Sequence, residues 1–170
     1  MEALLHSTLM IYAPIAIVIG GFIDTFFISG YLIYGFALSS AVLMIYTAGE
    51  ITYTQILISS YIGTLLGSYT NFLCGWFLAN TRPVRKVVDS PKMLRVRANL
   101  VSHNLFVAMF ICRFITVLRP ACLLVLGTLR LPAKKVLLYE AIIALVWVLV
   151  WSTILVVGAE TIIKTIKMAL

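Results

Sequence analysis

The sequence predicts an all-α integral membrane protein, built as an inverted repeat of a re-entrant helical hairpin plus a full transmembrane helix, with an extra N-terminal helix. The first observation is composition: 62% of the 170 residues are hydrophobic, 11% are charged and the mean hydropathy is +1.09. The second is a series of apolar runs long enough to cross a bilayer. The third is that two of these runs are interrupted near their middles. Together they exclude an ordinary soluble globule.

The chain is expected to form a single membrane domain, residues 1–170. Its predicted segments are a first span at 8–29, a re-entrant hairpin at 30–48, a full span at 51–79, a basic loop at 80–104, a second hairpin at 105–129 and a last span at 136–163. Residues 1–30 lack the basic start and the cleavage site of a signal peptide, so we expect the first span to be retained.

The net charge of +7 comes mostly from basic residues in loops and at the ends of apolar runs. Membrane topology explains that placement, so we expect no nucleic-acid partner. The positive-inside rule places the 80–104 loop in the cytoplasm, and residues 87–100 within it form either a surface helix on anionic headgroups or a solvated loop. The three cysteines and two histidines show no ligand spacing, which predicts no metal site and no cofactor.

Arg113 and Arg119 lie inside the apolar run 105–129. Placing a charged side chain in hydrocarbon costs free energy, so charged residues within a membrane span usually indicate a functional site. One continuous helix would place the two about 240° apart. Pro120 favours a break instead, because proline disfavours helical geometry at the residue before it and suits the first turn of a new helix. We therefore predict two short arms, each about 14 Å long, or half the hydrocarbon core.

The tip of this hairpin is a predicted anion site. The positive N-terminal end of its second arm would lie beside two guanidiniums. Ser39 and Ser40 interrupt the 30–48 run and have two interpretations: they bond back to their own helix, or one of them caps a second short arm. In the second interpretation, the two hairpins enter from opposite faces and their tips meet near the midplane, as in transporters with inverted repeats.

Polar residues elsewhere in the spans are further candidates. Ser68 and Asn71 follow the Gly63-x-x-x-Gly67 spacing, which allows helices to approach closely. They are predicted either to bond between helices or to contact substrate. Asp24 is an intramembrane acid or, as its place near the end of its run favours, a residue near the interface.

Two blocks of this sequence resemble motifs of the DedA family, also called VTT or SNARE-associated Golgi proteins. Residues 63–75 read G-T-L-L-G-S-Y-T-N-F-L-C-G, similar to the family's G-x-x-x-G-D-x-x-x-Y-x-x-G. Residues 113–119, followed by Gly127, are similar to R-F-x-P-x-x-R with its downstream glycine. The order and spacing of these blocks across residues 30–160 make the resemblance specific.

The resemblance implies two facing re-entrant hairpins and movement of polyprenyl phosphate or phospholipid headgroups between leaflets, often coupled to protons or sodium. The family's paired arginines correspond to Arg113 and Arg119. Its acids have no counterparts, because the hairpin tip near 39–42 has no carboxylate and Ser68 replaces the motif aspartate. The remaining candidates for coupling acids do not match the family's positions; they are Asp24, Glu50 and Glu140.

The leading prediction is a lipid transporter, a flippase or scramblase of the bacterial inner membrane, whose arginines bind a lipid phosphate beside Ser39, Ser40, Ser68 and Asn71. The alternative is a scaffold or assembly protein whose arginines pair with Glu50, Glu140 or backbone carbonyls. A lipid phosphatase is disfavoured, because the sequence has no nucleophile with a partner base, and we expect no enzyme activity. A homo-oligomer is a possible assembly.

Overall fold

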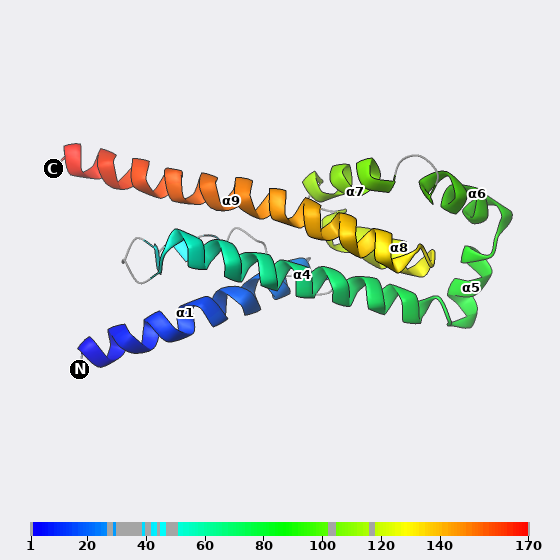
Figure 1. Cartoon of the computed structure of the whole chain (residues 1–170), viewed down its shortest axis with the longest axis horizontal. Helices are drawn as coiled ribbons and strands as arrows, with labels where there is room; N and C mark the ends of the chain where they lie inside the picture. Colours follow the sequence, from blue (N-terminus) through cyan, green and yellow to red (C-terminus); the bar gives the residue numbers. More distant parts are fainter. Residues whose placement is uncertain are drawn as a thin grey trace.

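The fold is that of a computed structural model, which describes residues 2–26, 29, 39, 42–43, 45–46, 51–101, 105–115 and 118–169. Throughout these residues the regular structure is helical, with no strand. The helices are α1 (Glu2–Thr25), α4 (Tyr53–Leu78), α5 (Arg82–Val88), α6 (Pro91–Asn99), α7 (Leu105–Phe114), α8 (Arg119–Thr128) and α9 (Ala133–Ala169). Figure 1 shows α4 and α9 running along the length of the molecule, with both termini at one end and α5 and α6 at the other.

The helix α9 is the described helix that is long and apolar enough to cross a membrane, through its stretch Ala133–Gly158 with mean hydropathy 2.5. The stretch Tyr12–Thr25 of α1 and the helix α7 (Leu105–Phe114) are also apolar but shorter. The helix α4 has 26 residues, or about 39 Å at 1.5 Å per residue. Its serines, threonines and asparagine make it less apolar than α9. The protein thus combines one strongly apolar helix with one long helix that bears polar side chains.

Glycines on α4 bring two other helices into close contact with it. A Cβ atom on Gly63 would meet the Val18 carbonyl group of α1, and a Cβ on Gly75 would meet the Leu124 carbonyl group of α8. Gly127 of α8 approaches the α4 backbone in the same way. The close approach that the glycine spacing predicts is therefore present, and it extends to a second helix pair. These contacts place α4 between α1 and α8.

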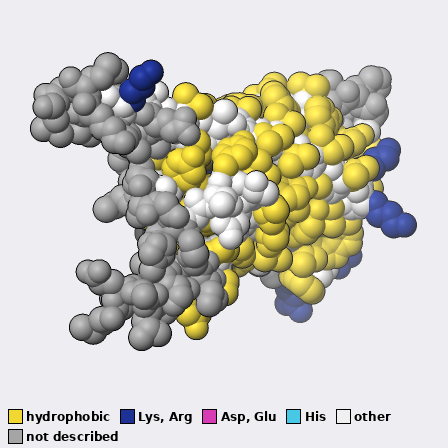
Figure 2. Space-filling view, turned by 60° about the vertical axis from the view of Figure 1, so that its left-hand side comes forward, with side chains coloured by type: hydrophobic (Ala, Val, Ile, Leu, Met, Phe, Trp, Pro, Cys, Tyr) yellow, Lys and Arg dark blue, Asp and Glu magenta, His cyan; other side chains and the backbone are white. Residues whose placement is uncertain are grey.

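The buried apolar residues form two clusters, and most of the exterior is apolar as well. The larger cluster joins α4, α7, α8 and α9 and contains Phe72, Leu105, Met109, Leu123, Leu126, Leu129, Leu131, Val136 and Ile143. The smaller one contains Ala13, Ile17, Ile51 and Ile56. In Figure 2 hydrophobic side chains cover most of the described part of the face in view, around patches of other atoms, with lysine and arginine at its margins. A continuous exposed surface of this kind requires an apolar environment such as lipid.

The run 105–129 contains the break that Pro120 predicts. The helix α7 ends at Phe114, α8 begins at Arg119, and the Leu118 and Arg119 amides both donate to the Ile115 carbonyl at 3.0 Å. The insertion of this hairpin from one membrane face remains a prediction. Most of the predicted 30–48 hairpin lies outside the described residues, so the inverted repeat also remains a prediction.

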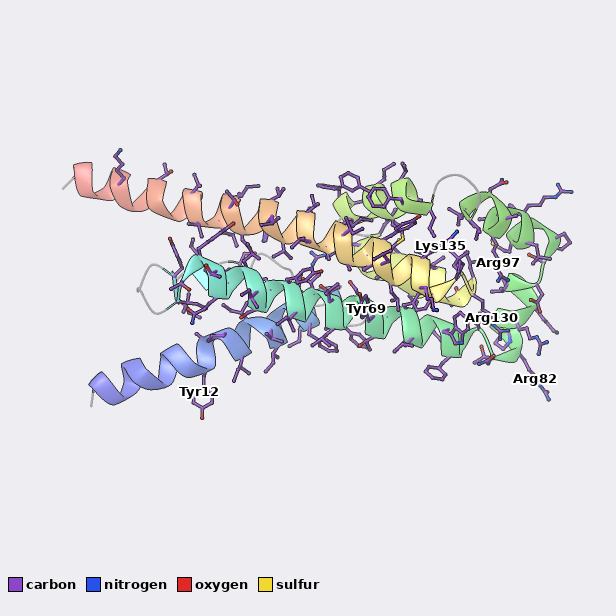
Figure 3. The ribbon with its side chains drawn as sticks, in the orientation of Figure 1. Tyr12, Tyr69, Arg82, Arg97, Arg130 and Lys135 are labelled. Carbon is purple, nitrogen blue, oxygen red and sulfur yellow. The ribbon has the colours of Figure 1, made fainter. Side chains whose placement is uncertain are left out.

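The basic segment 80–104 contains two short helices. Both have a proline in the first turn, and Ser90 caps α6 by accepting a hydrogen bond from the Met93 amide at 3.4 Å. Within residues 87–100 the structure has the end of α5, a break at 89–90 and the helix α6, and the contact of this segment with anionic headgroups remains a prediction. In Figure 3 the labelled basic side chains, Arg82, Arg97, Arg130 and Lys135, lie toward the α5–α6 end, while Tyr12 lies toward the other and Tyr69 between.

Candidate functional site

The side chain of Arg113 is buried at the end of α7, with the residue only 5% exposed. Its guanidinium forms an ion pair with Glu140 of α9. The same carboxylate oxygen accepts a hydrogen bond from the Ser68 hydroxyl of α4 at 2.7 Å. Because burying an unpaired charge is expensive, Glu140 supplies the counter-charge that lets Arg113 occupy this position. The three residues connect α4, α7 and α9.

Arg119 is the first residue of α8 and forms the second ion pair. One of its terminal nitrogens donates to the Asp24 carboxylate of α1 at 2.6 Å and to the Thr25 hydroxyl at 3.3 Å. The side chains of this pair are 15% and 20% exposed, against 4% for each side chain of the Arg113–Glu140 pair. The break between α7 and α8 thus separates an enclosed ion pair from a more accessible one.

Several donors of the two arginines remain unused. Arg113 Nε and Nη2 and Arg119 Nε are buried and have no hydrogen-bond partner within the part of the chain that the structure describes. Burying a donor without a partner destabilises the protein by the full desolvation free energy of that donor, so such atoms are rare and need an explanation. A guanidinium presents its donors as a planar fork that matches phosphate or carboxylate oxygens. The oxygens of a phosphate or carboxylate are acceptors of the kind that these nitrogens lack.

Aromatic side chains form one wall of the site. Arg119 Cζ lies 5.6 Å from the centroid of the Trp147 ring. The rings of Trp147 and Trp151 are stacked, with 5.9 Å between their centroids. The rings of Phe114 and Trp147 are nearly perpendicular, with 5.2 Å between their centroids. The Trp151 indole nitrogen donates to the Ser39 hydroxyl at 3.2 Å. This wall therefore links the hairpin break to the segment that contains Ser39.

The structure brings most of the sequence-predicted site residues into two groups of contacts, one around Arg113 and one around Arg119. Asn71 donates to the Thr25 carbonyl at 2.8 Å, which places it behind the Arg119–Asp24 pair, and Ser68 lies about one turn before it on α4. Asp24, for which the sequence favoured a place near the interface, forms an ion pair with Arg119 between α1 and α8. Ser40 and Glu50 lie outside the described residues.

Sequence reasoning missed Thr25 and the arginine contact of Trp147. Thr25 has an ordinary place at the end of an apolar run, and no local signal marks it. Trp147 did carry a signal, because it lies seven residues after Glu140 and residues at that spacing share one face of a helix. Glu140 is already among the partners predicted for the arginines in the scaffold alternative, and the indole on the same face of α9 could have been added to it.

Comparison with known proteins places the chain among membrane proteins. The VTT domain family matches residues 33–157. The inner membrane protein YabI of Escherichia coli (strain K12) is 25% identical over 152 residues, which cover 86% of this chain and 59% of YabI. The chain therefore spans less than two thirds of that relative's length. No solved structure matches it significantly.

Proposed function

This chain belongs to the VTT domain family, the DedA family of membrane proteins, and we propose that it moves a phosphate-bearing lipid from one leaflet to the other. The lipid is a polyprenyl phosphate or a phospholipid. Arg113 and Arg119 bind its phosphate oxygens, while its hydrocarbon chains stay in the bilayer. The inner-membrane name of the relative YabI supports a bacterial inner membrane as the location, with the basic segment 80–104 on the cytoplasmic side.

The observation that carries this proposal is a set of three buried guanidinium nitrogens, on Arg113 and Arg119, that have no partner among the described residues. If the arginines only held helices together, these unpaired buried donors would cost stability without any benefit to the protein. Phosphate oxygens can accept from several of them at once, with the geometry that a guanidinium fork favours. The donors lie on both sides of the α7–α8 break, so a phosphate at the break can contact both arms.

The surroundings of the donors suit the rest of a lipid. Large exposed apolar side chains flank the break, including Phe114 at 49% and Leu118 at 44% exposed. Hydrocarbon chains can rest against these residues while the headgroup lies inside the bundle. The cost of moving a phosphate through hydrocarbon is thereby reduced, because the arginine donors replace part of its hydration shell.

A scaffold is the second candidate, and one observation favours it. Each arginine already has a carboxylate partner, Glu140 for Arg113 and Asp24 for Arg119. If these ion pairs serve only to hold the helices together, the protein needs the pairs and not the free donors. A lipid phosphatase would differ from both, because it would release inorganic phosphate from the lipid.

Paired substitution separates these functions. Arg113→Leu alone strands the Glu140 charge, which costs about 3–5 kcal/mol, whereas replacing both residues of a buried pair by apolar ones is often neutral. We therefore expect the double variant Arg113→Leu/Glu140→Leu to fold. Purified wild-type protein in liposomes should speed the flipping of a labelled phospholipid or polyprenyl phosphate, and the folded double variant should not.

A second, more conservative variant is Arg119→Lys, which keeps the positive charge but loses the planar fork of the guanidinium. We expect it to retain the fold and to lose most of the flipping. A folded double variant that flips lipid at the wild-type rate would contradict the role proposed for the arginines, and wild-type protein that flips lipid no faster than protein-free liposomes would support the scaffold. Phosphate release from the labelled lipid would support the phosphatase.

A further inference from the structure

The candidate site contains two positive and two negative side chains among the described residues that form it. Arg113 and Arg119 supply the positive charges, and Glu140 and Asp24 the negative ones. The empty site is therefore formally neutral, and a phosphate cannot bind it without changing that balance. The question is which of the two carboxylates stays when an anion arrives.

Glu140 is built into the protein. The residue is 3% exposed, and its Oε1 receives both the Arg113 guanidinium and the Ser68 hydroxyl. It lies within the first third of the apolar stretch Ala133–Gly158 of α9, so moving its charge elsewhere would take it away from two donors into apolar surroundings. This carboxylate is a permanent member of the site.

Asp24 is held much less firmly. Its side chain is 20% exposed, and it contacts Arg119 through one oxygen at 2.6 Å. It lies in the last turn of α1, which has no basic residue there. The carbonyl groups at the end of a helix carry partial negative charge, so an acid at this position is electrostatically unfavourable. An anion at Arg119 can therefore take the place of Asp24 more easily than that of Glu140.

We propose that Asp24 is an exchangeable internal ligand of Arg119, whereas Glu140 is a fixed counter-charge that makes the site select a phosphodiester over a phosphomonoester. The inference rests on the proposed function and narrows its substrate class to diester phospholipids, because a polyprenyl phosphate is itself a phosphomonoester. When the side chain of Asp24 turns away from Arg119, the three groups that remain around the ligand, Arg113, Arg119 and Glu140, carry one net positive charge. A phosphodiester carries one negative charge and balances it.

A phosphomonoester does not fit the same balance. Its second proton dissociates with a pKa of about 6 in water, so above neutral pH it approaches two negative charges. Bound beside Glu140, it would leave an excess negative charge in a desolvated site. The fixed carboxylate therefore rejects the dianion while it tolerates the monoanion, which makes Glu140 a specificity-determining residue.

The test compares two lipids with identical acyl chains at pH 8.5. Phosphatidylglycerol is a monoanionic phosphodiester, and phosphatidic acid is a phosphomonoester. Binding to the purified 170-residue chain is measured by isothermal titration calorimetry in detergent micelles. Lipid flipping is measured in proteoliposomes. We expect the wild-type protein to bind phosphatidylglycerol more tightly, and equal binding of the two lipids would overturn the inference.

Two substitutions should move the preference in opposite directions. Glu140→Gln removes the fixed negative charge and should shift the ratio of the two affinities toward phosphatidic acid by about tenfold or more. Ser68→Asp adds a negative charge beside Glu140 and should shift the ratio further toward phosphatidylglycerol. Each variant tests the inference separately if the other fails to fold, and an unchanged ratio in a folded variant would overturn it.

Asp24→Asn is the matched control, because it removes the other carboxylate of the site. It should tighten the binding of both lipids and leave their ratio within about twofold of wild type, since the ligand displaces Asp24 in either case. A change of ratio as large as that of Glu140→Gln would contradict the division of roles. Selective binding without flipping would refute the proposed function alone, and flipping without selectivity would refute this inference alone.

Discussion

The guanidinium of Arg119 lies over the indole of Trp147, with 5.6 Å between Cζ and the ring centroid. Trp147 is seven residues after Glu140 on α9, so one face of this helix contacts both arginines: a carboxylate meets Arg113 and an indole meets Arg119. The ring cannot neutralise a charge as a carboxylate does, but its face attracts a cation without competing for the donors of the guanidinium. Arg119 is thereby oriented while its Nε has no partner within the described part of the chain.

Replacing Trp147 by leucine should slow lipid flipping. A cation–π contact in a desolvated place contributes about 1–2 kcal/mol, which corresponds to about a five- to thirtyfold loss of rate if the contact orients Arg119 for the phosphate. Trp147→Phe keeps an aromatic face and should lose less. The measurement is the flipping rate in proteoliposomes at equal protein content.

The control for this prediction is Trp76→Leu, which removes a partly exposed indole of α4 that contacts neither arginine in the described structure. Its ring contacts Phe72 and not the arginines, so the variant should leave the flipping rate of the folded protein within about twofold of wild type. If Trp147→Leu flips lipid as fast as Trp76→Leu, the indole does not position Arg119.

The contact between α4 and α8 should be intolerant of any added side-chain atom. A Cβ on Gly75 would lie 2.9 Å from the Leu124 carbonyl carbon, and a Cβ on Gly127 would lie 3.0 Å from the Trp76 amide nitrogen. Both neighbours are backbone atoms, so the helices themselves must separate. We expect Gly75→Ala and Gly127→Ala each to destabilise the protein by about 1–3 kcal/mol or more.

Gly158 of α9 provides the matched glycine control, because a Cβ there would have no neighbour within 4 Å. Alanine is the better helix former by about 1 kcal/mol, so Gly158→Ala should be neutral or stabilising. The three variants are compared by their thermal unfolding midpoints in detergent micelles. Equal midpoints for Gly75→Ala and Gly158→Ala would show that the α4–α8 contact is looser than described.

The corner between α8 and α9 carries a strained residue. Arg130 has φ of 52°, and its guanidinium donates to the Asn80 side chain at the end of α4. Arg130→Gly and Arg130→Ala both lose this hydrogen bond, but only glycine adopts the left-handed conformation without a steric cost. The glycine variant should therefore be more stable than the alanine variant by about 1–2 kcal/mol.

The size of the lost hydrogen bond at this corner can be measured separately with Asn80→Ala, which leaves the backbone of Arg130 unchanged. The readout for all three variants is again the unfolding midpoint in detergent. A glycine variant no more stable than the alanine variant would mean that the left-handed geometry at position 130 imposes no cost.

The sequence was sufficient for the features that local chemistry determines. Hydropathy predicts the membrane character that the family match supports, and Pro120 predicts the break that the structure has between α7 and α8. Glycine spacing predicts the close approach to α4. These features depend on residues that are near one another along the chain, so a linear pattern contains the necessary information.

The pairing of Arg113 with Glu140 is among those that the sequence predicted for the scaffold alternative, whereas the partner of Arg119 could not be predicted in the same way. Arg119 and Asp24 are 95 residues apart along the chain, and only the packing of α1 and α8 on α4 brings them together. At position 68 the sequence has serine where the family motif has aspartate, which pointed to a missing charge. The structure supplies a carboxylate there from another helix, because Glu140 lies 2.7 Å from the Ser68 hydroxyl.

The charge balance of the site also makes a prediction about pH. Phosphatidic acid loses its second negative charge as the pH falls through the second pKa of its phosphate, about 6 for a phosphomonoester in water, whereas phosphatidylglycerol keeps a single charge. If Glu140 rejects the dianion, lowering the pH from 8.5 to 5.5 should raise the flipping of phosphatidic acid relative to phosphatidylglycerol in the wild-type protein. Dividing one rate by the other removes any effect of pH on the protein that both lipids share. In Glu140→Gln the ratio should change less or fall, since the dianion is then the better match. A ratio that does not respond to pH in the wild-type protein would show that ligand charge is not what this site distinguishes.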